Sequence, residues 1–117
     1  MFRLRMATKF CAAHKLVGYD GKCENLHGHT WIVELFVMGK KLNKIGILTD
    51  FKVLKGQLNG LIDKLDHSYL NDLKEIGNPS AENICEYIFK NLQIPENVKL
   101  EKVRVWESET AYAEYFE

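Results

Sequence analysis

The chain has 117 residues, of which 46% are hydrophobic and 27% charged, and 16 lysines and arginines balance 16 aspartates and glutamates. This composition is typical of a soluble globular protein and predicts a single domain over residues 1–117. The zero net charge gives no electrostatic basis for binding nucleic acid or an anionic membrane, and no apolar stretch approaches the length of a membrane span.

Two strands are predicted in the first third of the chain. Residues 2–14 form the first, and a polar turn leads into a second at residues 29–39, where Gly39 and the lysines after it close a hairpin. If the second strand begins a few residues early, His27 and His29 lie two apart and point to the same face.

Two helices are predicted in the middle of the chain. Thr49 or Asp50 caps the first, and Asn78-Pro79-Ser80 forms the turn and N-cap of the second. Gly56 and Gly60 weaken the first helix if they are exposed, or else allow close packing. Each helix carries an apolar stripe at helical spacing: Phe51, Leu54, Leu58, Leu61, Ile62 and Leu65 in the first, and Ile84, Cys85, Ile88, Phe89 and Leu92 in the second.

Residues 98–107 and 110–116 are predicted to be the last two strands. The order ββααββ predicts an α+β fold in which both helices cover one face of a four-stranded antiparallel sheet. The other face carries Trp31 or Ile32, Phe36 and the terminal tyrosines, and it would be exposed in a monomer. We therefore predict a homo-oligomer in which sheets join into a larger barrel.

The cysteines lie at positions 11, 23 and 85 and form no Cys-x-x-Cys pair. Their odd number, and an N-terminus that lacks the continuous apolar region of a signal peptide, predict reduced thiols and a cytoplasmic protein. Cys11 and Cys85 fit apolar patterns and are predicted core residues.

Three histidines form a candidate metal site. His14 ends the first predicted strand, so pairing of the two strands would bring it to His27 and His29. Three protein ligands and one open position are how zinc is held when it does chemistry. The alternatives are that a backbone carbonyl satisfies His14, or that Cys23 is the fourth ligand of a structural zinc.

Further polar residues suit acid–base chemistry. Cys23 precedes the histidine pair, and a nearby cation would favour its thiolate as ligand, nucleophile or base. Asp66 and His67 are consecutive and can share a proton-transfer network, although His67 could instead cap the first helix. Glu107 shares the face of Val103 and Val105, so its carboxylate needs N–H donors, which a ligand could supply.

Together these motifs resemble the 6-pyruvoyltetrahydropterin synthase / 6-carboxytetrahydropterin synthase family over essentially the whole chain. The resemblance rests on a set of segments in matching order and spacing: Phe10-Cys-Ala-Ala-His14, Cys23-x-x-x-His27-Gly-His29, Asp50-Phe51, Leu65-Asp66-His67-x-Tyr-Leu-Asn71, Asn78-Pro-Ser-Ala-Glu82 and Trp106-Glu107. Ser80 departs from the family pattern, which usually has threonine there.

The resemblance implies the tunnelling fold, in which sheets of several subunits form a trimeric barrel and two rings commonly stack into a hexamer. It implies a carbon–oxygen lyase that binds Zn²⁺ through His14, His27 and His29 and acts on 7,8-dihydroneopterin triphosphate. Glu107 would anchor the pterin ring and Cys23 would be the general base. Asp66 and His67 would form the second proton-transfer element, contributed by a neighbouring subunit.

The resemblance leaves the product open. The spacing of three residues between Cys23 and His27 resembles that of the bacterial enzymes of queuosine biosynthesis, which make 6-carboxy-5,6,7,8-tetrahydropterin. The animal 6-pyruvoyl enzymes have a longer insertion at this place. Glu24 resembles the base of a folate-biosynthesis variant that releases 6-hydroxymethyl-7,8-dihydropterin, although it could equally be a solvated loop residue. A reading of another class is a non-catalytic module with structural zinc, which would leave Asp66, His67 and Glu107 unexplained.

Overall fold

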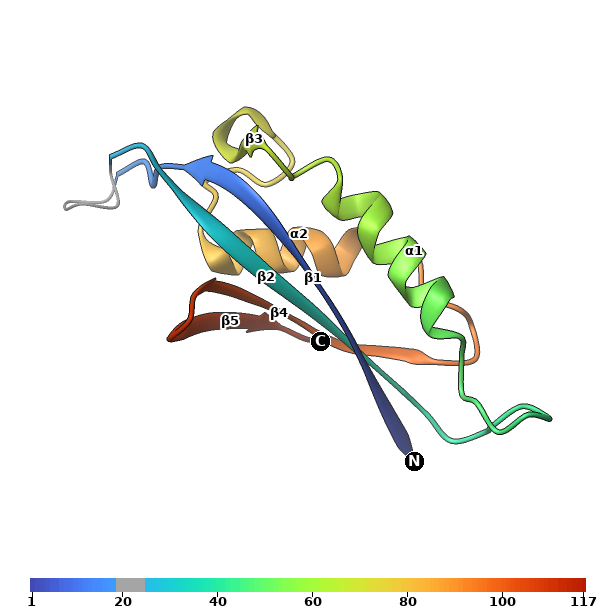
Figure 1. Ribbon diagram of the computed structural model, residues 1–117. Helices are drawn as coiled ribbons and strands as arrows, with labels where there is room; N and C mark the ends of the chain where they lie inside the picture. The colour runs from blue at the N-terminus through green and yellow to red at the C-terminus, as the bar shows by residue number, and fades with distance from the viewer. Residues whose placement is uncertain (19–24) are drawn as a thin grey trace.

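The computed structural model describes residues 1–18 and 25–117. Its elements follow the order ββα, a short connection, then αββ (Figure 1). In chain order they are β1 (Phe2–His14), β2 (His27–Gly39), α1 (Phe51–Ile62), β3 (Ser68–Tyr69), the 3-10 turn η2 (Leu70–Asp72), α2 (Ala81–Asn91), β4 (Lys99–Ser108) and β5 (Ala111–Tyr115). No helix in these described ranges is both long and apolar enough to cross a membrane.

The prediction of an α+β fold with both helices on one face of a sheet is confirmed (Figure 1). The strand number was wrong, because the sheet has five strands in the order β3-β1-β2-β4-β5. The additional strand, β3, runs parallel to β1 and pairs only Ser68 with Ala12 and Tyr69 with Ala13. Two residues are too short to show the alternation by which strands are recognised in a sequence.

Side-chain caps begin both helices where the sequence predicts. The Asp50 carboxylate accepts a hydrogen bond from the backbone N–H of Lys52, and the Ser80 hydroxyl accepts one from the N–H of Asn83. The α1 helix ends at Ile62, earlier than its apolar stripe suggests, and Leu65 is buried from the turn that follows. The chain is therefore already out of the helix when it reaches Asp66 and His67.

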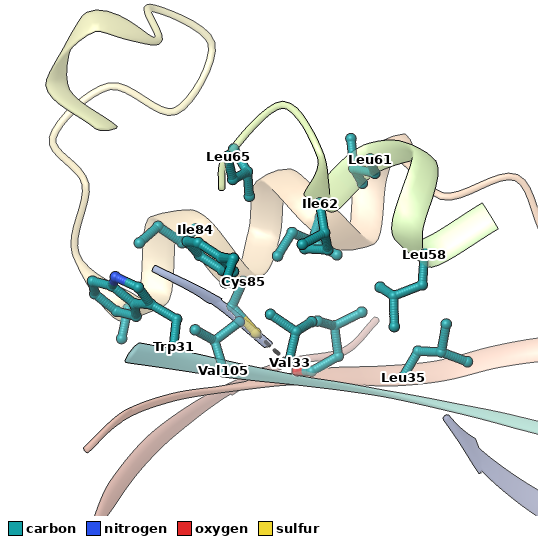
Figure 2. Close-up of a cluster of buried hydrophobic side chains, with 14 of the residues drawn as sticks. Trp31, Val33, Leu35, Leu58, Leu61, Ile62, Leu65, Ile84, Cys85 and Val105 are labelled. Carbon is teal, nitrogen blue, oxygen red and sulfur yellow. Dashed lines mark hydrogen bonds between the residues drawn. The ribbon is translucent and has the colours of Figure 1, made fainter. Parts of the chain in front are cut away.

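The core lies between the two helices and the sheet face that they cover. Figure 2 shows Leu58 and Ile62 of α1 pointing toward Val33 and Leu35 of β2. Cys85 is buried, as predicted, and its thiol donates a hydrogen bond to the Val103 carbonyl at 2.8 Å. Cys11 is exposed, so its predicted core position was wrong. Its neighbours Phe10 and Ala12 take the inward positions of β1.

The other sheet face carries charged groups over its apolar residues. Trp31 is fully buried among the core residues, so Ile32, which is 40% exposed, is the residue on this face. Phe36 is buried beneath Lys102 and Arg104, whose cationic groups lie 5.0 and 5.1 Å from its ring centre. Because these cations cover part of the apolar surface, the face is less exposed than the argument for a barrel assumed. The barrel stays a prediction.

A buried carboxylate lies on the same face. Glu34 accepts hydrogen bonds from Arg5 and Trp106 and is 4% exposed. Burial tends to raise the pKa of Glu34, but the hydrogen bonds from Trp106 and Arg5 outweigh it and hold this pKa below its ordinary value. The carboxylate is thus charged and paired at neutral pH, and it ties β2 to β1 and β4.

The glycines of α1 offer a test of helix stability. Gly56 and Gly60 are exposed, and a Cβ added at either would meet no atom within 4 Å, so close packing does not explain them. Alanine at each position should raise the free energy of unfolding by about 1 kcal/mol, measured by chemical denaturation. Gly46→Ala is the control and should lower stability, because Gly46 has a φ of 84° that L-residues rarely adopt. Unchanged stability in both helix variants would contradict the prediction.

Candidate metal centre

The pairing of β1 with β2 brings two of the predicted ligands together. The ladder ends with His14 opposite His27, because β2 begins two residues earlier than the predicted residue 29. His29 follows His27 by two residues and shares its face. Glu107, next to the last residue of β4, completes the cluster.

One ligand atom from each of these four side chains lies within 4.8 Å of the others. The Nε2 atoms of His14 and His27 are 3.0 Å apart, and Nε2 of His29 lies 3.1 Å from Oε1 of Glu107. Ligands 2.0–2.1 Å from a tetrahedral zinc would be about 3.3 Å from one another. The spacing of the donor atoms therefore suits a single ion of this size.

Backbone carbonyls orient two of the imidazoles. Nδ1 of His14 donates to the Pro79 carbonyl at 2.7 Å, and Nδ1 of His27 donates to the Asn25 carbonyl at 2.6 Å. A neutral imidazole with its proton on Nδ1 has a lone pair on Nε2. Two such lone pairs 3.0 Å apart repel each other unless a cation lies between or beside them. The cluster could accordingly hold a metal ion, with carbonyls in the positions that orient metal-bound histidines.

The third imidazole is also favoured in its neutral form. Nε2 of His29 is buried and has no hydrogen-bond partner among the described residues, although Oε1 of Glu107 lies 3.1 Å away. Burial lowers the pKa of His29, and the neighbouring His14 and His27 lower it further against the opposing effect of Glu107. An unpartnered ring nitrogen directed at other donors is what a metal ligand presents in the absence of its ion.

Trp31 packs against two histidines of the cluster. It is fully buried, and its indole ring centre lies 4.9 Å from that of His14 and 5.2 Å from that of His29. The indole N–H donates to the Ala12 carbonyl at 3.3 Å, which fixes the ring against β1. This contact could not be predicted from the sequence, because Trp31 fits the pattern of an ordinary core residue equally well.

Glu107 lies between the histidine cluster and a cavity. It was predicted as a substrate anchor on the apolar face of β4, and the structure also brings it within contact distance of His29. Its side chain is 32% exposed and borders a cavity of about 400 Å³ that is also lined by Glu82, Ala111 and Tyr112. Its face followed from the sequence, but its distance to the histidines depends on the pairing of β4 with β2, which the sequence does not reveal.

The side chains of Asp66 and His67 are in contact at the edge of β1. Nδ1 of His67 lies 3.0 Å from Oδ2 of Asp66, while the other Asp66 oxygen accepts from the backbone N–H of Cys11 at 2.9 Å. That N–H and the His67 imidazole both lower the pKa of Asp66, the N–H more strongly, against a smaller opposing effect of desolvation. Because α1 has already ended at Ile62, His67 is not a helix cap, and that alternative was wrong.

The backbone at His67 is held in an unusual conformation. Its φ is 57°, and its N–H donates to the Cys11 carbonyl at 2.6 Å. Among the described residues it is the single non-glycine with a positive φ. The imidazole is 81% exposed and is not part of the histidine cluster. Backbone conformations of this kind are common at functional sites, which agrees with the predicted role of His67 in proton transfer.

The remaining predicted residues, Cys23 and Glu24, lie outside the described residues. The structure therefore brings together His14, His27, His29 and Glu107, and separately Asp66 with His67.

Comparison with known proteins gives a consistent result. The family model described as 6-pyruvoyl tetrahydropterin synthase matches residues 3–117. A 6-carboxy-5,6,7,8-tetrahydropterin synthase of Haemophilus influenzae is 33% identical over 141 residues, with 100% of both chains covered. A dihydroneopterin monophosphate aldolase of Pyrococcus furiosus is 38% identical over 107 residues, covering 90% of this chain and 89% of the relative.

A solved structure, the 6-pyruvoyl tetrahydropterin synthase of Caenorhabditis elegans, has a TM-score of 0.85 to this chain at 23% identity. The match covers 99% of this chain and 95% of that one, and it demonstrates a shared fold over nearly the whole length.

Proposed function

Because the chain belongs to the 6-pyruvoyl tetrahydropterin synthase family, whose members are lyases, we propose that it is a zinc-dependent enzyme acting on 7,8-dihydroneopterin triphosphate. The proposed product is 6-carboxy-5,6,7,8-tetrahydropterin, as in the name of the Haemophilus influenzae relative. The observation that carries the proposal is the convergence of three imidazole Nε2 atoms, two of them oriented by backbone carbonyls.

The three histidines suit a catalytic zinc. Imidazole ligands with an open position are typical of zinc in enzymes, whereas structural zinc usually has four protein ligands and favours cysteine. Zinc bound there would act as a Lewis acid that polarises the hydroxyl oxygens of the substrate side chain and acidifies the neighbouring C–H and O–H bonds. We assign the fourth position to substrate rather than to Glu107.

Glu107 suits the role of pterin anchor. Its carboxylate can accept two hydrogen bonds from adjacent N–H groups, as a pterin ring presents them. The cavity that Glu107 borders, of about 400 Å³, offers room for a ring beside this carboxylate. An anchor at this distance would hold the side chain of the substrate within reach of His14, His27 and His29.

Two groups are proposed to move protons. Cys23 removes a proton from the substrate side chain, and the Asp66–His67 pair returns one at the adjacent carbon, which isomerises the side chain before triphosphate leaves by elimination. With one water consumed, the two-carbon fragment departs as acetaldehyde and the 6-carboxy product remains. His67 is exposed and lies outside the cluster, which suits its predicted action on the site of a neighbouring subunit in a trimer or hexamer.

A second candidate function comes from one relative. The Pyrococcus furiosus protein is named a dihydroneopterin monophosphate aldolase, and this chain has a glutamate, Glu24, beside Cys23. With Glu24 as the base, cleavage of the side chain would give 6-hydroxymethyl-7,8-dihydropterin. Without loss of carbon, the alternative product is 6-pyruvoyltetrahydropterin.

Mass spectrometry of the pterin product tests these alternatives. The zinc-loaded protein incubated with 7,8-dihydroneopterin triphosphate should yield the 6-carboxy product and acetaldehyde. We expect Cys23→Ala to lower kcat by about 10²- to 10⁴-fold, since it removes a general base, and Glu24→Ala to leave kcat within about threefold. Both variants should keep their zinc.

The opposite results have distinct meanings. If Glu24→Ala abolishes turnover and the product is the hydroxymethyl pterin, the aldolase-like function is correct. If Cys23→Ala loses zinc and stability together, Cys23 is a fourth ligand and the chain is a non-catalytic module with structural zinc.

A further inference from the structure

We propose that Asn71 and Asn78 are positioning residues, which fix the His14 imidazole by binding the backbone just beyond the end of β1. The inference rests on the proposed function, because it assigns these residues a role in presenting His14 to zinc. It is argued from a set of side-chain to backbone hydrogen bonds that lie outside the metal cluster.

The two asparagines make the same contact at alternate residues. The Asn71 side chain accepts from the N–H of Lys15 at 2.9 Å and donates to its carbonyl at 2.9 Å. The Asn78 side chain accepts from the N–H of Val17 at 3.0 Å and donates to its carbonyl at 3.1 Å. In an extended chain, alternate residues present both backbone groups to the same edge.

These side-chain contacts take the place of backbone pairing along the edge of β1. On that edge of β1, pairing with β3 covers only Ala12 and Ala13. Beyond this point a primary amide, which carries one acceptor and two donors, supplies the groups that a neighbouring strand would have supplied. The asparagine side chains therefore hold the backbone at Lys15 and Val17 although β1 has ended at His14.

Asn78 also reaches His14 by a second route. The next residue is Pro79, whose carbonyl accepts the Nδ1 proton of His14 at 2.7 Å. The contacts thus close a ring that runs from His14 along the backbone to Val17, across to Asn78, through Pro79 and back to the imidazole. Breaking the contact between Asn78 and Val17 opens this ring and frees the carbonyl to move away from the imidazole.

The far side of the ring is anchored to α2. The Asn78 carbonyl accepts from the backbone N–H of Ser80 at 2.8 Å and from the Asn83 side chain at 2.7 Å. Ser80 is the N-cap of α2, so Asn78 is joined to the first turn of a helix. His14 itself is 1% exposed. The helix start, the two asparagines and the buried imidazole thus form one continuous set of contacts, and Nε2 of His14 points at Nε2 of His27 as a result.

The test compares Asn78→Ala and Asn71→Ala with Asn43→Ala. Asn43 is a matched control, because its side chain also binds the backbone twice, accepting from Ile45 and Ile47 at 3.0 and 3.1 Å, in the loop between β2 and α1. Two quantities are measured: the zinc dissociation constant, by competition with a chromophoric chelator, and the tautomer of His14 in the zinc-free protein, by nitrogen NMR of the imidazole.

The two asparagine variants should raise the zinc dissociation constant by about 10- to 100-fold, the usual effect of losing a group that orients a metal ligand. Asn43→Ala should leave it within about twofold. In the zinc-free state His14 should carry its proton on Nδ1 both in the parent protein and in Asn43→Ala, whereas Asn78→Ala should give a mixture of tautomers. Equal zinc affinity and the same tautomer in all three variants would overturn the proposal.

A more conservative variant, Asn78→Asp, tests the proposal if Asn78→Ala fails to fold. Asn78→Asp keeps the oxygen that accepts from Val17 but loses the donor to the Val17 carbonyl, and it should weaken zinc binding in the same direction. If the parent protein binds no zinc, the proposed function fails, while the His14 tautomers of the parent and Asn78→Asp still decide the positioning role. A pure Nδ1 tautomer in Asn78→Asp, with zinc affinity unchanged, would contradict that role.

Discussion

Replacing His27 with alanine should abolish turnover and lower the affinity for zinc by about 10²- to 10⁴-fold. Proteins hold structural zinc with roughly 10–16 kcal/mol, so one of three or four ligands accounts for a few kcal/mol of that energy. His27 is chosen because it is only partly buried, whereas His14 is 1% exposed and its loss would also disturb the core. Zinc content after dialysis against a chelator of known affinity measures the effect.

His67→Ala is the matched control for this experiment. It removes the remaining histidine of the chain, which is 81% exposed and lies outside the metal cluster. This variant should keep the parental zinc content and lose turnover alone. If His27→Ala retains full zinc affinity, the three-histidine site is wrong, whatever happens to the activity.

Replacing Glu107 with glutamine should leave zinc bound and lower kcat/KM by about 10²-fold. Glutamine keeps the size of the side chain but replaces one acceptor oxygen with an NH₂ group, which faces the pterin N–H donors unfavourably. Losing a hydrogen bond to a charged group costs about 1.5–3 kcal/mol, which corresponds to a factor of about 10 to 150. Steady-state kinetics and metal analysis of the same preparation measure both quantities.

This variant decides between two roles for the carboxylate. Oε1 of Glu107 lies 3.1 Å from Nε2 of His29, close enough for Glu107 to be a fourth zinc ligand. In that case Glu107→Gln would lose zinc together with activity, and the assignment of the open position to substrate would fall. Glu109→Gln, at an exposed residue two positions further on, should change neither quantity.

Much of the fold could be predicted because its strands and helices show clear periods. The bounds of β1 matched the predicted residues 2–14, and Asp50 and Ser80 were identifiable as caps from their place before apolar stripes. β3 could not be predicted, since two residues have no period. Its pairing with β1 depends on the turn after α1, where hydrogen bonds from His67 and Cys11 fix the chain.

The candidate site likewise has parts that could be predicted from the sequence and parts that could not. The placement of His27 and His29 on one face follows from their spacing in a strand, and His14 joins them through the pairing of neighbouring strands. The carbonyls of Pro79 and Asn25 could not be found from the sequence, because any residue has a carbonyl and only the folded chain selects which one a histidine meets. The proximity of Glu107 to His29 likewise depends on tertiary structure.

The short reach of β3 has a consequence for the protein in the cell. Within the described part of the chain, β3 covers only Ala12 and Ala13 along the outer side of β1, and no strand lies beyond β5. Among the described residues, the outer sides of β5 and of the first part of β1, before Cys11, therefore have no strand partner, and such edges can pair with the edges of other newly made chains. Rapid association of these edges with those of correctly folded subunits would protect the protein from precipitation. The yield on refolding should therefore pass through an optimum as protein concentration rises, instead of declining steadily.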